Sequence, residues 1–334
     1  MSALNLLLLL IAIALLFDFL NGFHDSANVV ATIIASRAMS ARGALVLAAL
    51  GNLAGPFVLG VAVAETVGAE VVNAEAVSIG VVLAALRAAS LWDLATWYFG
   101  IPVSSSHALI GGIVGAAVTG SGMAAVQAQG LWKVGIALFV SPLAGFVVAM
   151  AIMQATLWLL RDAAPRANVA LSRAQVLTAA ALALSHGAND AQKTMGVIAM
   201  SLVTLGFIPT FYVPWWVIVL SASAIALGTA LGGWRIIRTL GTRFYRIHAI
   251  HGFTSQFASA AVILGASLAG GPVSTTQVVS MAILGAGAAE RKSKVRWAVL
   301  NDILVAWALT LPATALLAVP IYYLIASIMP TGRI

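Results

Sequence analysis

The chain contains no cysteine and few charged residues. Only 8% of its 334 residues are Asp, Glu, Lys or Arg, whereas soluble domains average about 25%. The absence of cysteine excludes disulfide bonds, thiolate metal sites and cysteine nucleophiles. Because 62% of the residues are hydrophobic, the chain has no room for a sizeable soluble domain, and its composition indicates a membrane protein.

Sequence patterns of common enzymes are missing as well. The chain has no His-Glu-x-x-His pattern, no Gly-x-Ser-x-Gly elbow and no Walker loop. Ser106 and His107 are adjacent, but adjacency in sequence does not create the hydrogen bond that a nucleophile and its base need. We therefore expect no enzyme activity and no cofactor. Without an ATP-binding domain, active transport would use an ion gradient unless a partner supplied the energy.

Apolar segments long enough to span a bilayer, about 20 residues each, recur from end to end. The first lacks the basic start and the cleavage site of a signal peptide, so we expect a retained helix. It is too long for one simple span and carries a polar pattern in its middle, which predicts a broken or tilted helix. Short stretches that follow two hydroxyl-rich turns look like re-entrant hairpins, and the expected number of crossings is ten to twelve. The apolar segments are 3–36, 43–64, 77–99, 131–160, 174–200, 214–234, 248–268, 275–289 and 297–328.

Three landmarks of the first half recur in the second half at a nearly constant distance. Two pairs of prolines have the same separation along the chain, and a pair of aspartates has nearly the same one. Such a period indicates internal duplication. We expect a first repeat at 1–160, a short cytoplasmic linker at 161–173 and a second repeat at 174–334. The pairs are Asp25 and Asp190, Pro102 and Pro272, and Pro142 and Pro312.

The distribution of basic residues predicts the topology. Most of the Lys and Arg residues fall in loops that share one side of the membrane if each half crosses it five times. Cytoplasmic loops collect basic residues, so both termini would lie outside, and the net charge of +7 requires no nucleic-acid partner. An odd number of crossings per half inverts the second repeat relative to the first. The predicted fold is an all-α polytopic membrane protein with two inverted-topology repeats of about five transmembrane segments each, broken helices and re-entrant hairpins. The basic residues on the shared side are Arg37, Arg42, Arg161, Arg166, Arg173, Arg235, Arg238, Arg243, Arg246, Arg291, Lys292, Lys294 and Arg296.

Two related patterns place a carboxylate inside long apolar segments. Gly22-Phe23-His24-Asp25-Ser26-Ala27-Asn28 lies in the first half, and Gly187-Ala188-Asn189-Asp190-Ala191-Gln192-Lys193 lies in the second. A charge at membrane depth costs about 2.5–3.5 kcal/mol on insertion scales. A structural ion pair could explain one such carboxylate, but a repeated one favours a functional role. The two copies differ where Lys193 matches Asn28.

Two hydroxyl-rich turns accompany the carboxylates. Pro102-Val103 precedes Ser104, Ser105 and Ser106, and Pro272-Val273 precedes Ser274, Thr275 and Thr276. Short hydroxyls and the free N–H groups of a helix start suit a small oxyanion. Ordinary helix capping is the alternative for each turn taken alone. His107 follows the first turn as either a proton carrier or a buried core histidine, and its counterpart is Gln277.

Together these motifs resemble the inorganic phosphate transporter (PiT) family over nearly the whole chain. The resemblance implies a secondary phosphate carrier of the cytoplasmic membrane, usually dimeric, whose inverted repeats hold phosphate between the two motif pairs. Members couple phosphate to sodium or to protons, and a few carry sulfate. Ala191-Gln192-Lys193 is similar to the bacterial low-affinity, proton-linked branch, whereas sodium-linked relatives have Ala-Asn there. Gln277 and Asn52 depart from the family pattern, where a histidine and an acidic residue are common.

Electrostatic repulsion gives a physical reason for coupled transport. Phosphate carries about 1.5 negative charges near neutral pH, and two like charges 4 Å apart cost about 4 kcal/mol at an effective dielectric constant of 20. Asp25 and Asp190 therefore need cations or protons before phosphate binds. Lys193 would supply permanently the charge that sodium supplies in relatives. We expect a proton-coupled phosphate symporter that carries phosphate or a neutral metal–phosphate complex; sodium coupling, sulfate transport and a passive channel are the alternatives.

The expected site residues follow from these motifs and from the resemblance. No resident metal site is predicted, and the expected partners are phosphate, a proton or sodium, the lipid bilayer and a second copy of the chain. Asp18, Arg87, Asp93 and Asp302 have no predicted role. Protons or ions are expected at Asp25, Asp190, Asn28 and His107. Phosphate is expected at Ser104, Ser105, Ser106, Ser274, Thr275, Thr276, Asn28, Asn189, Gln192 and Lys193.

Overall fold

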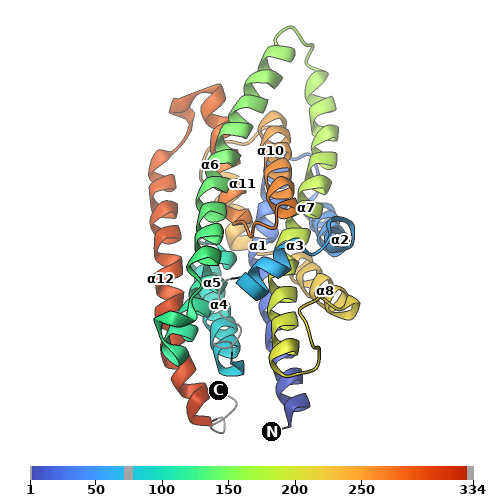
Figure 1. Cartoon of the computed structure of the whole chain (residues 1–334). Helices are drawn as coiled ribbons and strands as arrows, with labels where there is room; N and C mark the ends of the chain where they lie inside the picture. The colour runs from blue at the N-terminus through green and yellow to red at the C-terminus, as the bar shows by residue number, and fades with distance from the viewer. Residues whose placement is uncertain (1, 71–77, 329–334) are drawn as a thin grey trace.

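The computed structural model describes residues 2–70 and 78–328, which form helices and their connections without an extended strand. Figure 1 shows long helices packed side by side. A π-helical turn at Thr66–Glu70 follows α3. The α-helices are α1 (Ala3–Ala35), α2 (Ala41–Leu59), α3 (Ala62–Glu65), α4 (Ile79–Phe99), α5 (Ser105–Ser121), α6 (Ala128–Leu159), α7 (Ala167–Thr204), α8 (Trp215–Leu231), α9 (Trp234–Thr242), α10 (Ala249–Leu268), α11 (Thr275–Glu290) and α12 (Trp297–Ile328).

Most helices begin and end where the sequence predicts. The segments expected at 248–268, 275–289 and 297–328 are α10, α11 and α12, with boundaries that agree to about one residue. The Ser40 and Ser78 side chains cap α2 and α4 by accepting a backbone N–H three residues on, at 3.2 Å each. α7 begins at Ala167, inside the segment 161–173 that the sequence suggests as a linker.

Of the broken or tilted helix expected at the first carboxylate pattern, the break is absent. α1 and α7 run without interruption through both patterns. The pattern glycines are points of close helix contact instead: a Cβ at Gly22 would lie 2.2 Å from the Ile225 carbonyl oxygen, and one at Gly187 would lie 2.3 Å from the Asn52 Cα. Small residues at such contacts let membrane helices approach closely. The sharp bend lies elsewhere, where α8 and α9 meet at 69°.

Fewer helices qualify as full spans than the ten to twelve crossings expected. Among the described residues, seven helices are long and apolar enough to cross a membrane, and the bent pair α8–α9 brings the number to eight. α5 and α11 contain only 17 and 16 residues. A full span needs about 20 residues. The expected short stretches after the hydroxyl-rich turns are therefore present as short helices.

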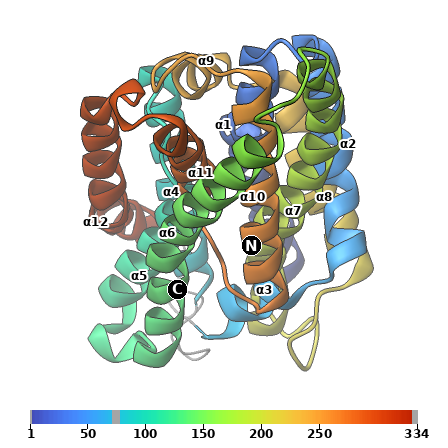
Figure 2. The same cartoon turned by 90° about the horizontal axis from the view of Figure 1, so that it is seen from above.

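The two halves of the chain pack their helices in the same pattern. The corresponding helices are α1 and α7, α2 and α8, α4 and α10, α5 and α11, and α6 and α12. α1 packs on α8 as α7 packs on α2, and α5 packs on α12 as α11 packs on α6. α4 contacts α5 and α12 in the same way that α10 contacts α11 and α6. Figure 2 shows the two sets of helices from above. The main contacts therefore join the two halves, which form one body.

Matched helices of the two halves run in opposite directions. In Figure 1, α1 starts at the end of the molecule where α7 finishes, and α6 starts near the end where α12 finishes. The connections α6–α7 and α11–α12 lie at the opposite end of the molecule. The basic residues of these two connections, Arg161, Arg166 and 291–296, therefore share one end. Arg333 lies outside the described residues.

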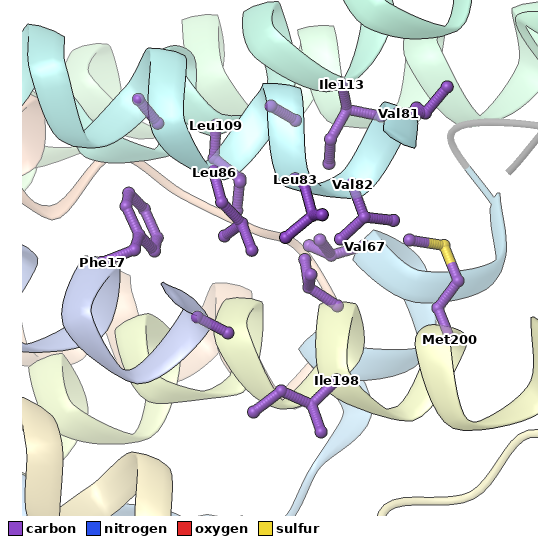
Figure 3. Close-up of a cluster of buried hydrophobic side chains, with 14 of the residues drawn as sticks. Phe17, Val67, Val81, Val82, Leu83, Leu86, Leu109, Ile113, Ile198 and Met200 are labelled. Carbon is purple, nitrogen blue, oxygen red and sulfur yellow. The ribbon is translucent and has the colours of Figure 1, made fainter. Parts of the chain in front are cut away.

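The hydrophobic core consists of several clusters of buried side chains, and the largest surrounds α4. Every residue of α4 from Ile79 to Leu86 is buried. Figure 3 shows this cluster, in which α4 packs against α1, α5 and α7. Large apolar side chains also cover the outside of the molecule, as a surface in contact with lipid requires. Examples are Leu8, Phe57, Phe139, Leu177, Leu227 and Leu316.

Candidate functional site

The two hydroxyl-rich turns lie against each other. α5 begins directly after the first turn and α11 directly after the second. The Ser106 hydroxyl donates to the Val273 carbonyl oxygen over 3.0 Å and so joins the two turns. The first N–H groups of a helix have no acceptor within the helix, so two helix N-termini present free donors in one region.

Capping accounts for the first hydroxyl of each turn. The Ser104 Oγ accepts the N–H of His107 at 3.2 Å, and the Ser274 Oγ accepts the N–H of Gln277 at 3.3 Å. Ordinary helix capping, the alternative to anion binding that the sequence left open, therefore applies to Ser104 and Ser274. The next hydroxyls of each turn point to the buried carboxylates or to the opposite turn.

A threonine from the other half holds each turn at its preceding glycine. Gly100 and Gly270 both adopt left-handed backbone conformations, with φ of 68° and 70°. The Gly100 carbonyl accepts the Thr239 hydroxyl at 2.8 Å, and the Gly270 carbonyl accepts the Thr66 hydroxyl at 2.7 Å. The backbone therefore enters the two turns in the same way at corresponding positions of the two halves.

Asp25 lies buried on α1, next to the start of α11. Its Oδ1 lies 2.7 Å from His24 Nδ1 and accepts the Thr276 hydroxyl at 3.1 Å. Its Oδ2 lies 3.3 Å from the Ser105 hydroxyl of the first turn. The Asn28 amide donates to Thr276 Oγ1 at 3.0 Å. The structure thus brings Asp25 and Asn28 together with residues of both turns.

Asp190 occupies the matching place on α7. The Lys193 ammonium donates to Asp190 Oδ1, to the Ser106 hydroxyl and to the Val273 carbonyl, the last at 3.2 Å. His186 Nε2 lies 3.1 Å from Asp190 Oδ2. Lys193 is only 1% exposed, so its charge is compensated by Asp190 within the protein rather than by water.

Thr275 connects the two carboxylates. Its Oγ1 lies 3.0 Å from Asp190 Oδ2 and 3.4 Å from Asp25 Oδ2. A hydroxyl carries one proton and can donate to only one of these oxygens at a time. The two half-sites expected from the sequence therefore form one continuous polar cluster, in which the carboxylates compete for a donor.

The hydrogen bonds around His186 determine which ring nitrogen carries hydrogen. Thr229 donates its proton to the Ile225 carbonyl at 2.8 Å, so its oxygen accepts the Asn52 amide, also at 2.8 Å. Asn52 then presents its Oδ1 to His186 Nδ1 at 3.2 Å, and Nδ1 must carry hydrogen. Nε2 lies 3.1 Å from Asp190 Oδ2 but forms no hydrogen bond with it among the described residues.

The same reasoning applies to His24. Thr96 donates its proton to the Trp92 carbonyl at 2.8 Å, and its oxygen lies 3.4 Å from His24 Nε2. Nε2 is therefore the nitrogen with hydrogen in a neutral ring, and Nδ1 faces Asp25 Oδ1. This short contact requires a proton. Each buried aspartate thus lies beside a histidine, 2.7 Å away for Asp25 and 3.1 Å away for Asp190.

The side chains of three expected site residues form no hydrogen bond with the cluster within the part of the chain that the structure describes. Asn189 donates to Ser267 Oγ at 2.8 Å. Gln192 donates to the Gly60 carbonyl at 2.6 Å and accepts the Val63 N–H at 2.7 Å, which places it at the connection between α2 and α3. His107 is 6% exposed, and its Nδ1 has no hydrogen-bond partner among the described residues.

His24 and His186 are not among the site residues expected from the sequence, and the buried network behind them was missed as well. Their positions beside the aspartates, at i−1 and i−4, were the available signal. Asn52 holds the His186 ring by a contact of 3.2 Å to Nδ1, and no local sequence pattern reveals this contact. Of the unassigned charged residues, Asp18 and Asp93 are buried within the bundle, and neither oxygen of Asp93 has a hydrogen-bond partner among the described residues. Arg87 is half-buried and Asp302 is exposed.

Asp25, His186 and Asp190 could also contribute ligands to a cation. Their ligand atoms all lie within 4.8 Å of one another. Lys193 already places a positive charge on Asp190, and His186 offers nitrogen, whereas hard cations such as sodium or magnesium favour oxygen ligands. The donor set therefore suits a hard cation poorly.

Comparisons with known proteins agree with this arrangement. Residues 21–318 match the phosphate transporter family. The chain belongs to this family. Its members are transporters, so this phosphate transporter family member is a multi-pass membrane transporter and not an enzyme.

Two relatives and one solved structure show how far the likeness extends. A "Probable low-affinity inorganic phosphate transporter" of Rhizobium meliloti (strain 1021) is 44% identical over 96% of this chain and 97% of the relative. A protein of Bacillus subtilis (strain 168) with the same description is 40% identical over the same shares. A solved structure named "The sodium-dependent phosphate transporter" matches with a TM-score of 0.87 over 97% of this chain and all of that chain. At 24% identity, this last match shows a common fold.

Proposed function

We propose that the protein is a proton-coupled symporter that imports inorganic phosphate across the cytoplasmic membrane. The observation that carries this proposal is the composition of the polar cluster. Each of two buried aspartates lies beside a histidine that can carry a proton, and a buried lysine neutralises one of the aspartates. The names of the relatives with 40–44% identity support phosphate as the transported anion.

The charges of the cluster explain why protons would accompany phosphate. Two carboxylates, one ammonium and two protons leave one net positive charge, which suits an anion with about 1.5 negative charges. Loss of both protons would make the cluster negative. Each like-charge contact at about 4 Å would then cost about 4 kcal/mol at an effective dielectric constant of 20. Phosphate and protons therefore bind together or not at all.

The hydroxyls provide the link between protonation and phosphate binding. Thr275 and Thr276 now direct their hydroxyls at the carboxylates, whereas the Ser105 hydroxyl donates to Asn21 Oδ1 at 2.6 Å. A carboxylate that takes up a proton is a weaker acceptor. The released hydroxyls, with Asn28 and the free N–H groups at the starts of α5 and α11, can then surround the phosphate oxygens.

Alternating access would arise from two inverted repeats that move against each other around this cluster. The matching packing of the two halves and the opposite directions of α1 and α7 support inverted repeats. The gathering of basic connections at one end supports a cytoplasmic location for that end, with both termini outside. A homodimer, as the family resemblance implies, and transport of a neutral metal–phosphate complex belong to the same proposal.

Sodium coupling is the second candidate. It is favoured by the ligand atoms of Asp25, His186 and Asp190, which lie close together, and by the name of the solved structure with the same fold. In that case a sodium ion would replace the protons at His186 and His24. Lys193 argues against it, because its ammonium already occupies one oxygen of Asp190.

Uptake of labelled phosphate into proteoliposomes tests the proposal. In sodium-free buffer, the wild-type protein should accumulate phosphate, and Asp25→Asn or Asp190→Asn should abolish accumulation. Asp302→Asn, at an exposed carboxylate of α12, is the matched control and should transport normally. Excess sulfate should not compete. Full accumulation by either site variant would remove that aspartate from the mechanism.

A further inference from the structure

A second polar cavity lies apart from the carboxylate cluster, at the end of α1. Its volume is about 390 Å³, within the range of about 300–1,000 Å³ that is usual for small-molecule sites. The end of α1, the connection between α9 and α10, and the residue before α12 form its wall. The polar residues of this wall include Ser36, Arg37, Tyr245, Arg246, His248 and Arg296.

The wall of this cavity carries positive charge without a compensating carboxylate. Arg37, Arg246 and Arg296 all line it, and no acidic residue does. Within residues 2–70 and 78–328, none of these guanidinium groups forms an ion pair. Glu290 belongs to a neighbouring connection, but His251 at 2.6 Å and Lys294 already occupy its two oxygens.

The backbone holds these arginines in place. Arg37 has φ of 61°, and no other non-glycine residue of the described chain has a positive φ. This conformation ends α1 in the usual way, because the Arg37 N–H donates to the Ile34 carbonyl at 3.0 Å and the Ala38 N–H to the Ile33 carbonyl at 3.1 Å, so the position of Arg37 is fixed by the helix end. The Arg296 N–H donates to the Phe244 carbonyl at 3.1 Å, which fixes the α11–α12 connection against the α9–α10 connection. The Tyr245 hydroxyl donates to the Ile283 carbonyl at 2.6 Å and anchors the floor of the cavity.

We propose that this cavity is a binding site for a phosphate-bearing anion larger than inorganic phosphate. Guanidinium groups bind phosphate oxygens in pairs, and three of them converge here. The site is separate from the transport cluster, because Arg37 lies more than two helical turns beyond Asn28 along the chain, a distance of about 13 Å on a helix. A soluble phosphate compound and the headgroup of an anionic lipid share the chemistry that the site recognises.

The cavity is connected to the helices of the transport cluster. The Ser36 hydroxyl donates to Gln175 Oε1 on α7 at 2.8 Å. One turn closer to the cluster, Gln256 of α10 donates to Thr32 Oγ1 and accepts the Thr178 hydroxyl, both at 2.9 Å. An anion in the cavity would therefore contact the end of α1, the helix that carries Asp25. It would also contact Ser36, which is hydrogen-bonded to Gln175 of α7. This places the site where its occupancy can alter the movement of these helices.

Binding of inorganic pyrophosphate to the full-length protein in nanodiscs of phosphatidylcholine tests this site by calorimetry. The triple variant Arg37→Gln, Arg246→Gln, Arg296→Gln should weaken binding by at least about 100-fold, because several charge-assisted hydrogen bonds are lost. Arg246→Gln alone should weaken it by about 10-fold, which provides a milder variant in case the triple variant folds poorly. The matched control is Arg42→Gln, Arg166→Gln, Arg173→Gln, which removes the same charge at positions outside the cavity and should bind as the wild type does.

Two further measurements separate this proposal from transport and identify the source of the anion. Asp190→Asn should still bind pyrophosphate, whatever its effect on uptake. In nanodiscs that contain phosphatidylglycerol, native mass spectrometry should show one more retained lipid on the wild type than on the cavity variant if a headgroup is the ligand, and equal numbers if the ligand is soluble. Equal pyrophosphate affinity in the cavity variant and the control, or no binding to the wild type, would overturn the proposal.

Discussion

Replacing Lys193 by methionine would leave Asp190 buried without its ammonium partner. Both groups are almost completely excluded from the surface. Removal of one partner of a buried ion pair costs about 3–5 kcal/mol. The Val273 carbonyl would keep the Ser106 hydroxyl as a donor, so loss of its bond from Lys193 adds only about 0.5–1.5 kcal/mol. Methionine keeps much of the apolar stem, so the loss reports mainly on charge.

A double-mutant cycle measures how much of this cost comes from the pair itself. Asp190→Asn alone should also be destabilising, because it leaves the Lys193 charge unpaired. The double variant Lys193→Met, Asp190→Asn removes both charges and should be more stable than the sum of the single changes predicts, by at least about 2 kcal/mol. Unfolding in mixed micelles with increasing sodium dodecyl sulfate provides the free energies. Additive effects within about 0.5 kcal/mol would refute the view that Lys193 and Asp190 compensate each other.

Three further predictions concern the surroundings of the cluster. Gly187→Ala should destabilise the protein by about 1–3 kcal/mol in the same micelle unfolding assay, because its Cβ would lie 2.3 Å from the Asn52 Cα. The control Gly265→Ala should be neutral or slightly stabilising, because a Cβ there meets nothing within 4 Å. Asn52→Leu should fold, but it should reduce the initial rate of phosphate uptake by about 10- to 100-fold and alter the pH profile of uptake. The reason is that His186 loses the acceptor that fixes its ring. An unchanged pH profile would contradict this role of Asn52. Burial raises the pKa of the Glu290 carboxyl, but hydrogen bonds from Lys294 and His251 outweigh this effect and hold that pKa below its usual range. A depressed folded-state pKa stabilises the protein above the ordinary value of about 4.3, and this contribution is lost as the pH falls through the folded-state pKa. Glu290→Gln should therefore cost less than about 1 kcal/mol at neutral pH, and this cost should disappear as the pH falls through the folded-state pKa, as thermal unfolding across pH can show.

The sequence was sufficient to identify the membrane class, the helix boundaries and the residues that meet in the centre. Asp25, Asp190, Asn28 and Lys193 lie together with the hydroxyl-rich turns because the turns open two short helices toward the middle of the bundle. The repeat period, the polarity of short segments and the helix-start signals can each be read from a short stretch of sequence, and the folded protein contains the features that they predict.

Other features depend on contacts that no local pattern contains. A glycine in an apolar helix marks either a break or a close contact, and only the neighbouring helix decides between them, as Ile225 does for Gly22. Likewise, the hydrogen that His186 carries depends on Asn52 and Thr229 from two other helices. Gln192 follows the pattern of the site but turns to the α2–α3 connection, because unpaired backbone groups there require a partner.

The central claim is that protons, not sodium ions, accompany phosphate. The most direct measurement is phosphate accumulation in proteoliposomes with the membrane potential clamped, under either a pH gradient without sodium or a sodium gradient at equal pH. Coupling through protons at His24 and His186 predicts accumulation with the pH gradient alone and no response to sodium. Accumulation that requires the sodium gradient and ignores the pH gradient would contradict the account.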